Sequence, residues 1–275
     1  MKPAAFAYAD PTTVDEAVAL LAEHGDDAAV LAGGQSLVPL MNLRLARPSV
    51  VIDLRRITEL STLDRGPAGV RAGAMAGITT LAEQHPNPGV GEAIQWIGHP
   101  QIRARTTVGG TIAHADPAAE LPAVLLALDG TVQLTSSSGT RSVPAAEWFD
   151  GSFSTTRRPD ELVVAVNLPT LDGPNTWLEL ARRRGDFALV GLFLGRHDSA
   201  WRVACSGVGS TPVRATRCEA ALAGGDLQSA TAELMAELAP DDDLHSSAAH
   251  RRALAATLLS RAFRQLEPDT TATAA

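Results

Sequence analysis

Two pairs of adjacent glycines are the residues whose type and spacing could do chemistry in this sequence. Gly33 and Gly34 follow a short apolar run, and Gly109 and Gly110 lie among hydroxyl-bearing residues. Glycine lacks Cβ, so consecutive glycines can adopt positive φ and let backbone N–H groups converge. Converging N–H groups bind phosphate oxygens. Taken alone, the first pair is more typical of a plain tight turn, and the second of a turn or bulge, than of a phosphate site.

Hydroxyl groups stand beside both pairs, as a phosphate site would require. Ser36 follows the first pair, and Thr107 and Thr111 flank the second. A helix that starts after a glycine pair would add the positive end of its dipole. Two such sites suit a ligand with two phosphates. A Rossmann or P-loop protein is not predicted, because no GxGxxG follows the first strand and the chain contains neither GxxxxGKS nor GxxxxGKT.

Three further polar residues, His114, Asp116 and Glu120, follow the second glycine pair. They could bind a ribityl or ribose hydroxyl, and Asp116 could equally cap a helix. The sequence has no HxxxH, HExxH or cysteine cluster, so no metal site is predicted. It also has no GxSxG elbow, which leaves hydrolase chemistry without support.

Composition limits the class of protein. The chain has 275 residues, 45% of them hydrophobic and 20% charged, as in ordinary soluble globular proteins. A net charge of -8 does not favour a nucleic-acid partner. Cys205 and Cys218 are too few for a four-thiolate iron–sulfur cluster, and we expect both to be reduced and semi-buried. With no signal peptide and no apolar run of about 20 residues, we expect a cytoplasmic protein without a membrane span.

The first 55 residues read as one α/β unit, which we predict as a first subdomain. Residues 13–24 have helical periodicity, Thr13 and Glu16 have capping-box spacing, and Gly25 is a stop signal. Strands are predicted at residues 28–32 and 50–54, and a helix near residues 38–43. The first glycine pair therefore lies between a strand and a helix.

Residues 56–173 form the second predicted subdomain. We expect strands at 70–74, 131–135 and 162–168, and helices starting near 79 and spanning 90–97. The glycine- and threonine-rich residues 103–114 are predicted to be largely loop or strand. Asp116 and Pro117 can open a helix that runs to Leu128, with aspartate as the cap.

Residues 174–268 form the third predicted part. Residues 177–181, 189–194 and 201–208 predict a short sheet, and three helices follow. In the last helix apolar residues repeat every four positions from Leu254 to Leu266. The Thr/Ala-rich tail, 269–275, is predicted to be disordered.

Three segments make the chain recognisable. VLAGGQSLVPLMNLRLARPSVVIDL, residues 30–54, resembles the first FAD-binding segment of the medium subunit (subunit M) of molybdenum hydroxylases of the carbon monoxide dehydrogenase/xanthine dehydrogenase type. TTVGGTIAHADPAAELPAVLLALDGTV, residues 106–132, resembles its second segment. ARRRGDFALVG, residues 181–191, resembles the segment that opens its C-terminal domain. One glycine pair is weak evidence, but three long motifs in family order are specific.

The resemblance implies an α+β fold. It consists of a two-subdomain, PCMH-like FAD-binding domain and a small α+β C-terminal domain with a short sheet and helices. By the resemblance, the two glycine segments wrap the diphosphate; their residues are Ala32, Gly33, Gly34, Gln35, Ser36, Leu37, Thr107, Val108, Gly109, Gly110 and Thr111. The resemblance places three polar residues near the flavin or its ribityl chain: His114, Asp116 and Glu120. It places two more residues near the isoalloxazine: Asp186 and Phe187.

The resemblance also implies the function. The chain would be an FAD-binding electron-transfer subunit, with a molybdenum cofactor in a large partner subunit and two [2Fe–2S] clusters in a small one, as a dimer of heterotrimers. Electrons would pass through the clusters to FAD and then to NAD⁺, a quinone, a carrier or oxygen. The cofactor supplies the redox chemistry, so no catalytic residue is predicted. A stand-alone flavin oxidase and a flavin-free assembly protein are the competing hypotheses.

The sequence departs from the commoner family pattern at three positions. Asn42 and Glu179 stand where lysine is frequent, and Thr106 replaces a frequent glycine. Losing two lysines makes the flavin's surroundings less positive. The departures leave the phosphate-binding glycines unchanged.

Overall fold

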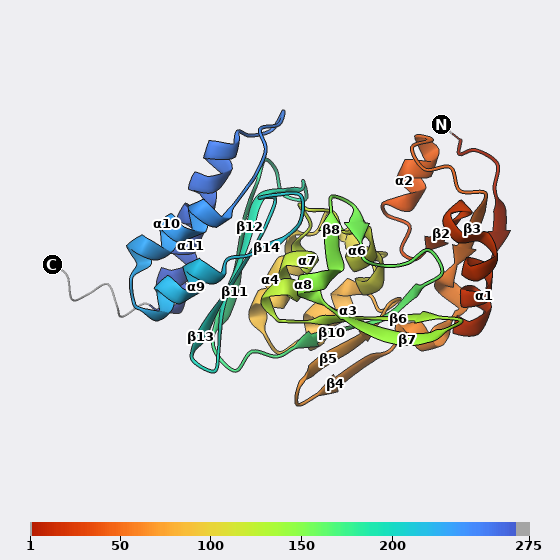
Figure 1. Ribbon diagram of the computed structural model, residues 1–275, viewed down its shortest axis with the longest axis horizontal. Helices are drawn as coiled ribbons and strands as arrows, with labels where there is room; N and C mark the ends of the chain where they lie inside the picture. Colours follow the sequence, from red (N-terminus) through yellow and green to blue (C-terminus); the bar gives the residue numbers. More distant parts are fainter. Residues whose placement is uncertain (1, 268–275) are drawn as a thin grey trace.

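Three parts, each with its own sheet, follow one another along the longest axis of the molecule (Figure 1). The computed structural model describes residues 2–267, so the predicted tail at 269–275 lies outside the described residues. The mixture of helices and strands confirms the predicted α+β class. None of the helices within residues 2–267 is both long and apolar enough to cross a membrane.

The first part is a small parallel sheet covered by helices. Its strand order is β1-β3-β2, so the crossover after β2 carries the first glycine pair. The Thr13 hydroxyl accepts a hydrogen bond from the Glu16 N–H at 3.2 Å, which confirms the predicted N-terminal cap of the first helix. The elements are β1 (Ala7–Ala9), α1 (Val14–His24), η1 (Gly25–Asp27), β2 (Ala28–Leu31), α2 (Leu37–Asn42), β3 (Val50–Asp53), η2 (Leu54–Arg56) and η3 (Thr58–Ser61).

The second part is a five-stranded antiparallel sheet of order β4-β5-β10-β6-β7 with helices packed on it. Trp148 is fully buried in its core and donates its indole N–H to the Ile112 carbonyl at 3.0 Å. The elements are β4 (Leu63–Gly66), β5 (Gly69–Gly73), α3 (Ile78–Gln84), α4 (Pro88–Trp96), α5 (Pro100–Arg103), α6 (Val108–His114), α7 (Glu120–Ala127), β6 (Thr131–Ser136), β7 (Gly139–Pro144), α8 (Ala145–Trp148), β8 (Phe149–Gly151), β9 (Ser154–Thr155) and β10 (Leu162–Pro169).

Two predictions for this part are wrong. Residues 103–114 are not largely loop or strand: only residues 104–107 lie outside helices, α5 ends at Arg103, and α6 contains the second glycine pair. Intrinsic propensity disfavours glycine and threonine in helices, but contacts with the rest of the fold override it. Helix α7 begins at Glu120 and not after Asp116, whose carboxylate instead accepts the Ala118 N–H at 2.9 Å in a turn.

The third part is a four-stranded antiparallel sheet of order β11-β12-β13-β14. The three predicted helices follow it, and they lie on one face of the sheet (Figure 1). Cys205 and Cys218 are free and fully buried in its core. On the other face, Trp177 and Phe193 join the core of the second part. The elements are β11 (Asn175–Ala181), β12 (Ala188–His197), β13 (Ala200–Ser206), β14 (Val213–Arg214), α9 (Thr216–Ala223), α10 (Leu227–Glu237) and α11 (Ala248–Leu266).

Candidate functional site

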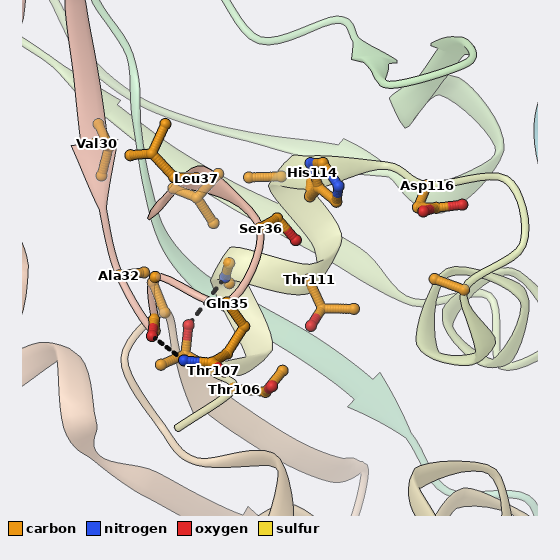
Figure 2. A pocket seen from close by; sticks show the side chains of 18 of the residues that line it. Val30, Ala32, Gln35, Ser36, Leu37, Thr106, Thr107, Thr111, His114 and Asp116 are labelled. Atoms are coloured by element: carbon orange, nitrogen blue, oxygen red, sulfur yellow. Dashed lines mark hydrogen bonds between the residues drawn. The ribbon is translucent and has the colours of Figure 1, made fainter. Parts of the chain in front are cut away.

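A cavity of about 640 Å³ collects residues from all three parts of the chain. This volume is in the range of cofactor and small-molecule sites. The loop between β2 and α2 forms one wall, and α6 with the turn after it forms the facing wall (Figure 2). Every residue predicted for the site lines the cavity except Val108, whose side chain is fully buried in the core. The contact between Val108 and the cofactor stays a prediction.

The first glycine loop offers a row of free donors. Among residues 2–267, no protein oxygen accepts a hydrogen bond from the backbone N–H groups of Gly33, Gly34, Gln35, Ser36 and Leu37. Gly34 has φ of +73°, a conformation that glycine adopts without strain. The Gln35 side-chain amide donates to the Gly33 carbonyl at 3.0 Å and fixes the turn. Successive free N–H groups of this kind form a nest for anions.

The second glycine pair is different, because its N–H groups are already bonded within the protein. The Gly109 N–H donates to the Ala74 carbonyl at 2.9 Å, and the Gly110 N–H donates to the Thr107 hydroxyl at 3.1 Å. The Thr111 N–H donates to the Thr107 carbonyl at 3.1 Å. The prediction of converging free N–H groups at this pair is therefore wrong. What α6 presents to the cavity here is glycine backbone and the Thr111 side chain (Figure 2).

The glycines of both pairs permit close contacts. A Cβ on Gly109 would lie 2.5 Å from the Ala74 Cβ, so α6 packs directly on the end of β5. A Cβ on Gly33 would lie 2.2 Å from the Arg105 carbonyl oxygen, and one on Gly110 would lie 3.4 Å from the Ala32 Cβ. The two glycine segments, far apart in sequence, therefore touch each other across the cavity.

Beyond the glycine segments, His114 and Asp116 line the cavity where α6 ends. Ala115 has φ of +50° and ends the helix. The His114 ring packs against Phe153 with centroids 5.1 Å apart. Asp116 is only 9% exposed, and burial raises the pKa of its carboxyl, an effect that the Ala118 N–H and His114 oppose.

Two further glutamates are buried in this region of the fold. Glu120, the first residue of α7, is 5% exposed and lines the cavity, whereas Glu179 on β11 is 7% exposed and is not among the residues that line it. Burial, and then the charge of Glu179, raise the pKa of Glu120 well above its ordinary value. Burial raises the pKa of Glu179 to about 7, against the opposing effects of the Trp177 indole and Arg184.

The third part contributes Asp186 and Phe187 to the rim of the cavity. Asp186 pairs with Arg183, with 3.1 Å between Nε and Oδ2. The Phe187 side chain is 69% exposed, so it marks the opening to solvent. Gly185 precedes them with φ of +88° and lies against His99. The segment identified by its motif thus lies at the same cavity as the two glycine segments.

Several residues that also line the cavity carry no signal in the sequence. Ile97, Gly98 and Ile102 come from the end of the helix predicted over residues 90–97 and from the segment after it, for which no element was predicted. Arg157 and Glu161 come from the loop before β10. The Arg157 guanidinium is held by the Glu161 carbonyl at 2.8 Å, and Arg141 pairs with the Glu161 carboxylate at 2.6 Å. Only the three-dimensional arrangement brings these residues to the site.

Comparisons with known proteins decide the family. A family model described as the FAD binding domain in molybdopterin dehydrogenase matches residues 4–171, and one described as the CO dehydrogenase flavoprotein C-terminal domain matches residues 175–266. The chain belongs to this flavoprotein family. It is an FAD-binding oxidoreductase subunit, which confirms the family, the cofactor and the function inferred from the three motifs.

Relatives of this flavoprotein match it along nearly its whole length. The 6-hydroxypseudooxynicotine dehydrogenase complex subunit alpha of Paenarthrobacter nicotinovorans is 39% identical over 95% of this chain and 94% of that protein. The carbon monoxide dehydrogenase medium chain of Hydrogenophaga pseudoflava is 34% identical over 96% and 97%. Among solved structures, reconstituted CO dehydrogenase from Oligotropha carboxidovorans superposes with a TM-score of 0.93 at 31% identity, over 98% of this chain and 99% of that one.

Proposed function

We propose that FAD lies in the 640 Å³ cavity with its diphosphate against the first glycine loop. The observation that carries this placement is the row of backbone N–H groups from Gly33 to Leu37 that no protein oxygen within residues 2–267 accepts. A backbone N–H group without a hydrogen-bond acceptor costs free energy in a folded protein, unless water or a ligand supplies the acceptor. Successive backbone N–H groups of this kind form a concave site that binds phosphate oxygens.

The facing wall has another role in this proposal. The Gly109 and Gly110 N–H groups are hydrogen-bonded within the protein. Helix α6 would therefore let FAD come close to its glycine backbone and would offer the Thr111 hydroxyl. His114, Asp116 and Glu120 would lie along the ribityl chain or flavin, and Asp186 and Phe187 would cover the flavin end at the rim. The remaining proposed contacts are Ala32, Gln35, Ser36, Leu37 and Thr107, all of which line the cavity.

We further propose that this subunit is the exit relay of a molybdenum hydroxylase. Bound FAD would supply two-electron redox chemistry, taking electrons from [2Fe–2S] clusters in a small partner subunit and passing them to an external acceptor. A large partner subunit would carry the molybdenum cofactor, and the assembly would be a dimer of heterotrimers. Relatives named as the alpha or medium subunit of dehydrogenase and hydroxylase complexes support this. The two buried free cysteines suit a reducing cytoplasm, where we place the complex.

The phosphate placement is tested at Ser36, which lines the cavity and makes no capping hydrogen bond. Ser36→Asp puts a negative charge beside the proposed diphosphate, whereas Ser36→Asn adds a neutral side chain of the same size. We expect the aspartate variant to bind FAD about 10- to 100-fold more weakly than the asparagine variant, on the order of 2 kcal/mol. Titration of the flavin-free chain with FAD, followed by flavin fluorescence, measures it. Equal affinities would place the diphosphate elsewhere.

The relay proposal is tested by purification from the native source. Co-purification with a molybdenum-containing chain and an iron–sulfur chain is the expected result. Steady oxidation of an organic substrate by the isolated subunit would instead identify a stand-alone oxidase. A folded, colourless chain that does not take up added FAD would identify an assembly protein.

A further inference from the structure

The end of the cavity away from its polar residues is apolar. Figure 2 shows Val30 on one side of Ser36 and Leu37, and His114 and Asp116 on the other side. The apolar residues that line the cavity near Val30 belong to one hydrophobic cluster or pack against it, so they lie together. They come from α1, β2, η2 and β10: Leu21, Ala28, Val30, Leu54 and Leu162.

This apolar end suits the adenosine half of FAD. Strand β2 runs from it into the first glycine loop, because Val30 precedes Gly33 by three residues, about 10 Å along the chain. With the diphosphate on the loop and the flavin near His114 and Asp116, the base and its ribose fall in the apolar end. Cofactor sites of this kind combine apolar walls with a few polar groups that fix the orientation of the ligand.

Arg157 supplies a polar group at this end. It is the only lysine or arginine among the described residues that line the cavity. Its Nη1 donates to the Glu161 carbonyl at 2.8 Å, and Glu161 directly precedes Leu162, the first residue of β10. The hydrogen bond therefore places the guanidinium beside the start of β10, at the apolar end of the cavity.

Only one nitrogen of this guanidinium is held by the protein. Nη1 donates to the carbonyls of Arg158, Pro159 and Glu161, at 2.9, 3.3 and 2.8 Å. Nε and Nη2 have no hydrogen-bond acceptor among residues 2–267, and no ion pair in that range includes Arg157. The Glu161 carboxylate pairs instead with Arg141, at 2.6 and 2.8 Å. Two donor nitrogens of Arg157 are therefore available to a ligand.

An adenosine matches these two nitrogens. A guanidinium carries N–H donors in a fixed plane and no acceptor, and it stacks on aromatic faces. Adenine offers ring-nitrogen acceptors, and nucleotide bases stack on arginine planes. We propose that Arg157 is a specificity-determining residue, which binds the adenosine half of FAD and makes the cavity select FAD over FMN. The inference rests on the proposed binding of FAD in this cavity.

Three ligands separate the two halves of the cofactor. FMN contains the isoalloxazine, the ribityl chain and one phosphate, whereas ADP contains the adenosine and the diphosphate. In Arg157→Gln we expect the flavin-free full chain to bind FAD and ADP about tenfold more weakly, and FMN within about twofold of the wild type. The matched control is Arg158→Gln, a change at the exposed neighbouring arginine, which should leave the binding of all three ligands unchanged. Calorimetric titration measures the three dissociation constants.

The pattern across the three ligands decides the role of Arg157. Equal weakening of FAD, ADP and FMN would show that Arg157 only holds its loop, and would overturn the selection. Unchanged binding of FAD and ADP would overturn it too, while the wild-type affinity for FAD would still support the proposed function. If the glutamine variant does not fold, Arg157→Lys carries the same comparison, because its ammonium can donate to the loop carbonyls but lacks the planar guanidinium. A wild-type chain that binds neither FAD nor FMN would overturn the proposed function and this inference with it.

Discussion

The two glycine pairs look alike in sequence and have different roles in the structure. At Gly33 and Gly34 a run of backbone N–H groups has no acceptor among residues 2–267, and Gly34 takes a positive φ that makes the turn. At Gly109 and Gly110 the N–H groups are bonded within the protein, and the glycines allow a helix to pack against β5 and the opposite loop. A glycine pair beside hydroxyl residues therefore indicates that another group, from a ligand or from the protein itself, comes close to the backbone. Only the hydrogen bonds of the glycine N–H groups distinguish ligand binding from packing.

The largest effect on cofactor binding is expected for Gly110→Val. Its Cβ would meet the Thr107 hydroxyl at 2.7 Å and approach Ala32, so the added side chain disturbs the helix cap and enters the space between the two walls. We expect FAD binding to weaken about 100-fold, on the order of 3 kcal/mol. Flavin absorbance of the purified variant measures it. Stoichiometric FAD in a folded variant would show that this wall does not touch the cofactor.

Gly109→Ala should act on stability more than on FAD affinity. Its Cβ would lie 2.5 Å from the Ala74 Cβ, and overpacking of this kind costs about 1–3 kcal/mol of the free energy of unfolding. Gly91→Ala in α4 is the matched control, because a Cβ there makes only an ordinary contact at 3.4 Å. Urea unfolding of both variants gives the comparison. Similar stabilities would remove the packing role assigned to Gly109.

Thr107→Val removes the hydroxyl that accepts the Gly110 N–H and keeps the side-chain shape. Loss of this cap should lower the free energy of unfolding by about 1 kcal/mol. FAD affinity should stay within a few-fold of the wild type, because the freed N–H group can then serve as a donor. A large loss of affinity with unchanged stability would mean that the Thr107 side chain binds the cofactor itself.

The effect of Ser36→Ala is also small and falls on FAD affinity alone. The variant removes one neutral hydroxyl and leaves the backbone N–H groups in place. We expect FAD to bind about fivefold more weakly, about 1 kcal/mol, without a change in thermal stability. Calorimetric titration measures the affinity. A loss as large as that expected for Gly110→Val would mean that the hydroxyl, and not the backbone, dominates this wall.

Much of the fold follows from sequence patterns, and the exceptions have physical causes. For helix α1 the sequence predicts a buried apolar face and a threonine cap, and the structure has both. Helix α6 has neither good propensity nor a long apolar stripe. It forms because Thr107 caps it and its first N–H groups bond to Ala74 and Ala76. Its stability comes from contacts with residues distant in the sequence, which local patterns do not report.

The candidate site was predictable only in part. The glycines and Ser36 stand out by type, and the resemblance supplied the order of the segments. Glu120 and Glu179 are both buried in the structure, although no local pattern in the sequence predicts it. Arg157 reaches the cavity through a loop without any motif. The predicted domain limits stay a prediction, although each sheet uses strands from one predicted part.

The contact between Gly33 and the Arg105 carbonyl also bears on how FAD could bind and leave. The Gly33 backbone lies so close to the Arg105 carbonyl that the two segments are in direct packing contact there. Separation of the two walls would break this contact, whereas Phe187 at the rim of the cavity is 69% exposed. An FAD molecule that enters past Phe187 would leave the contact between Gly33 and Arg105 intact.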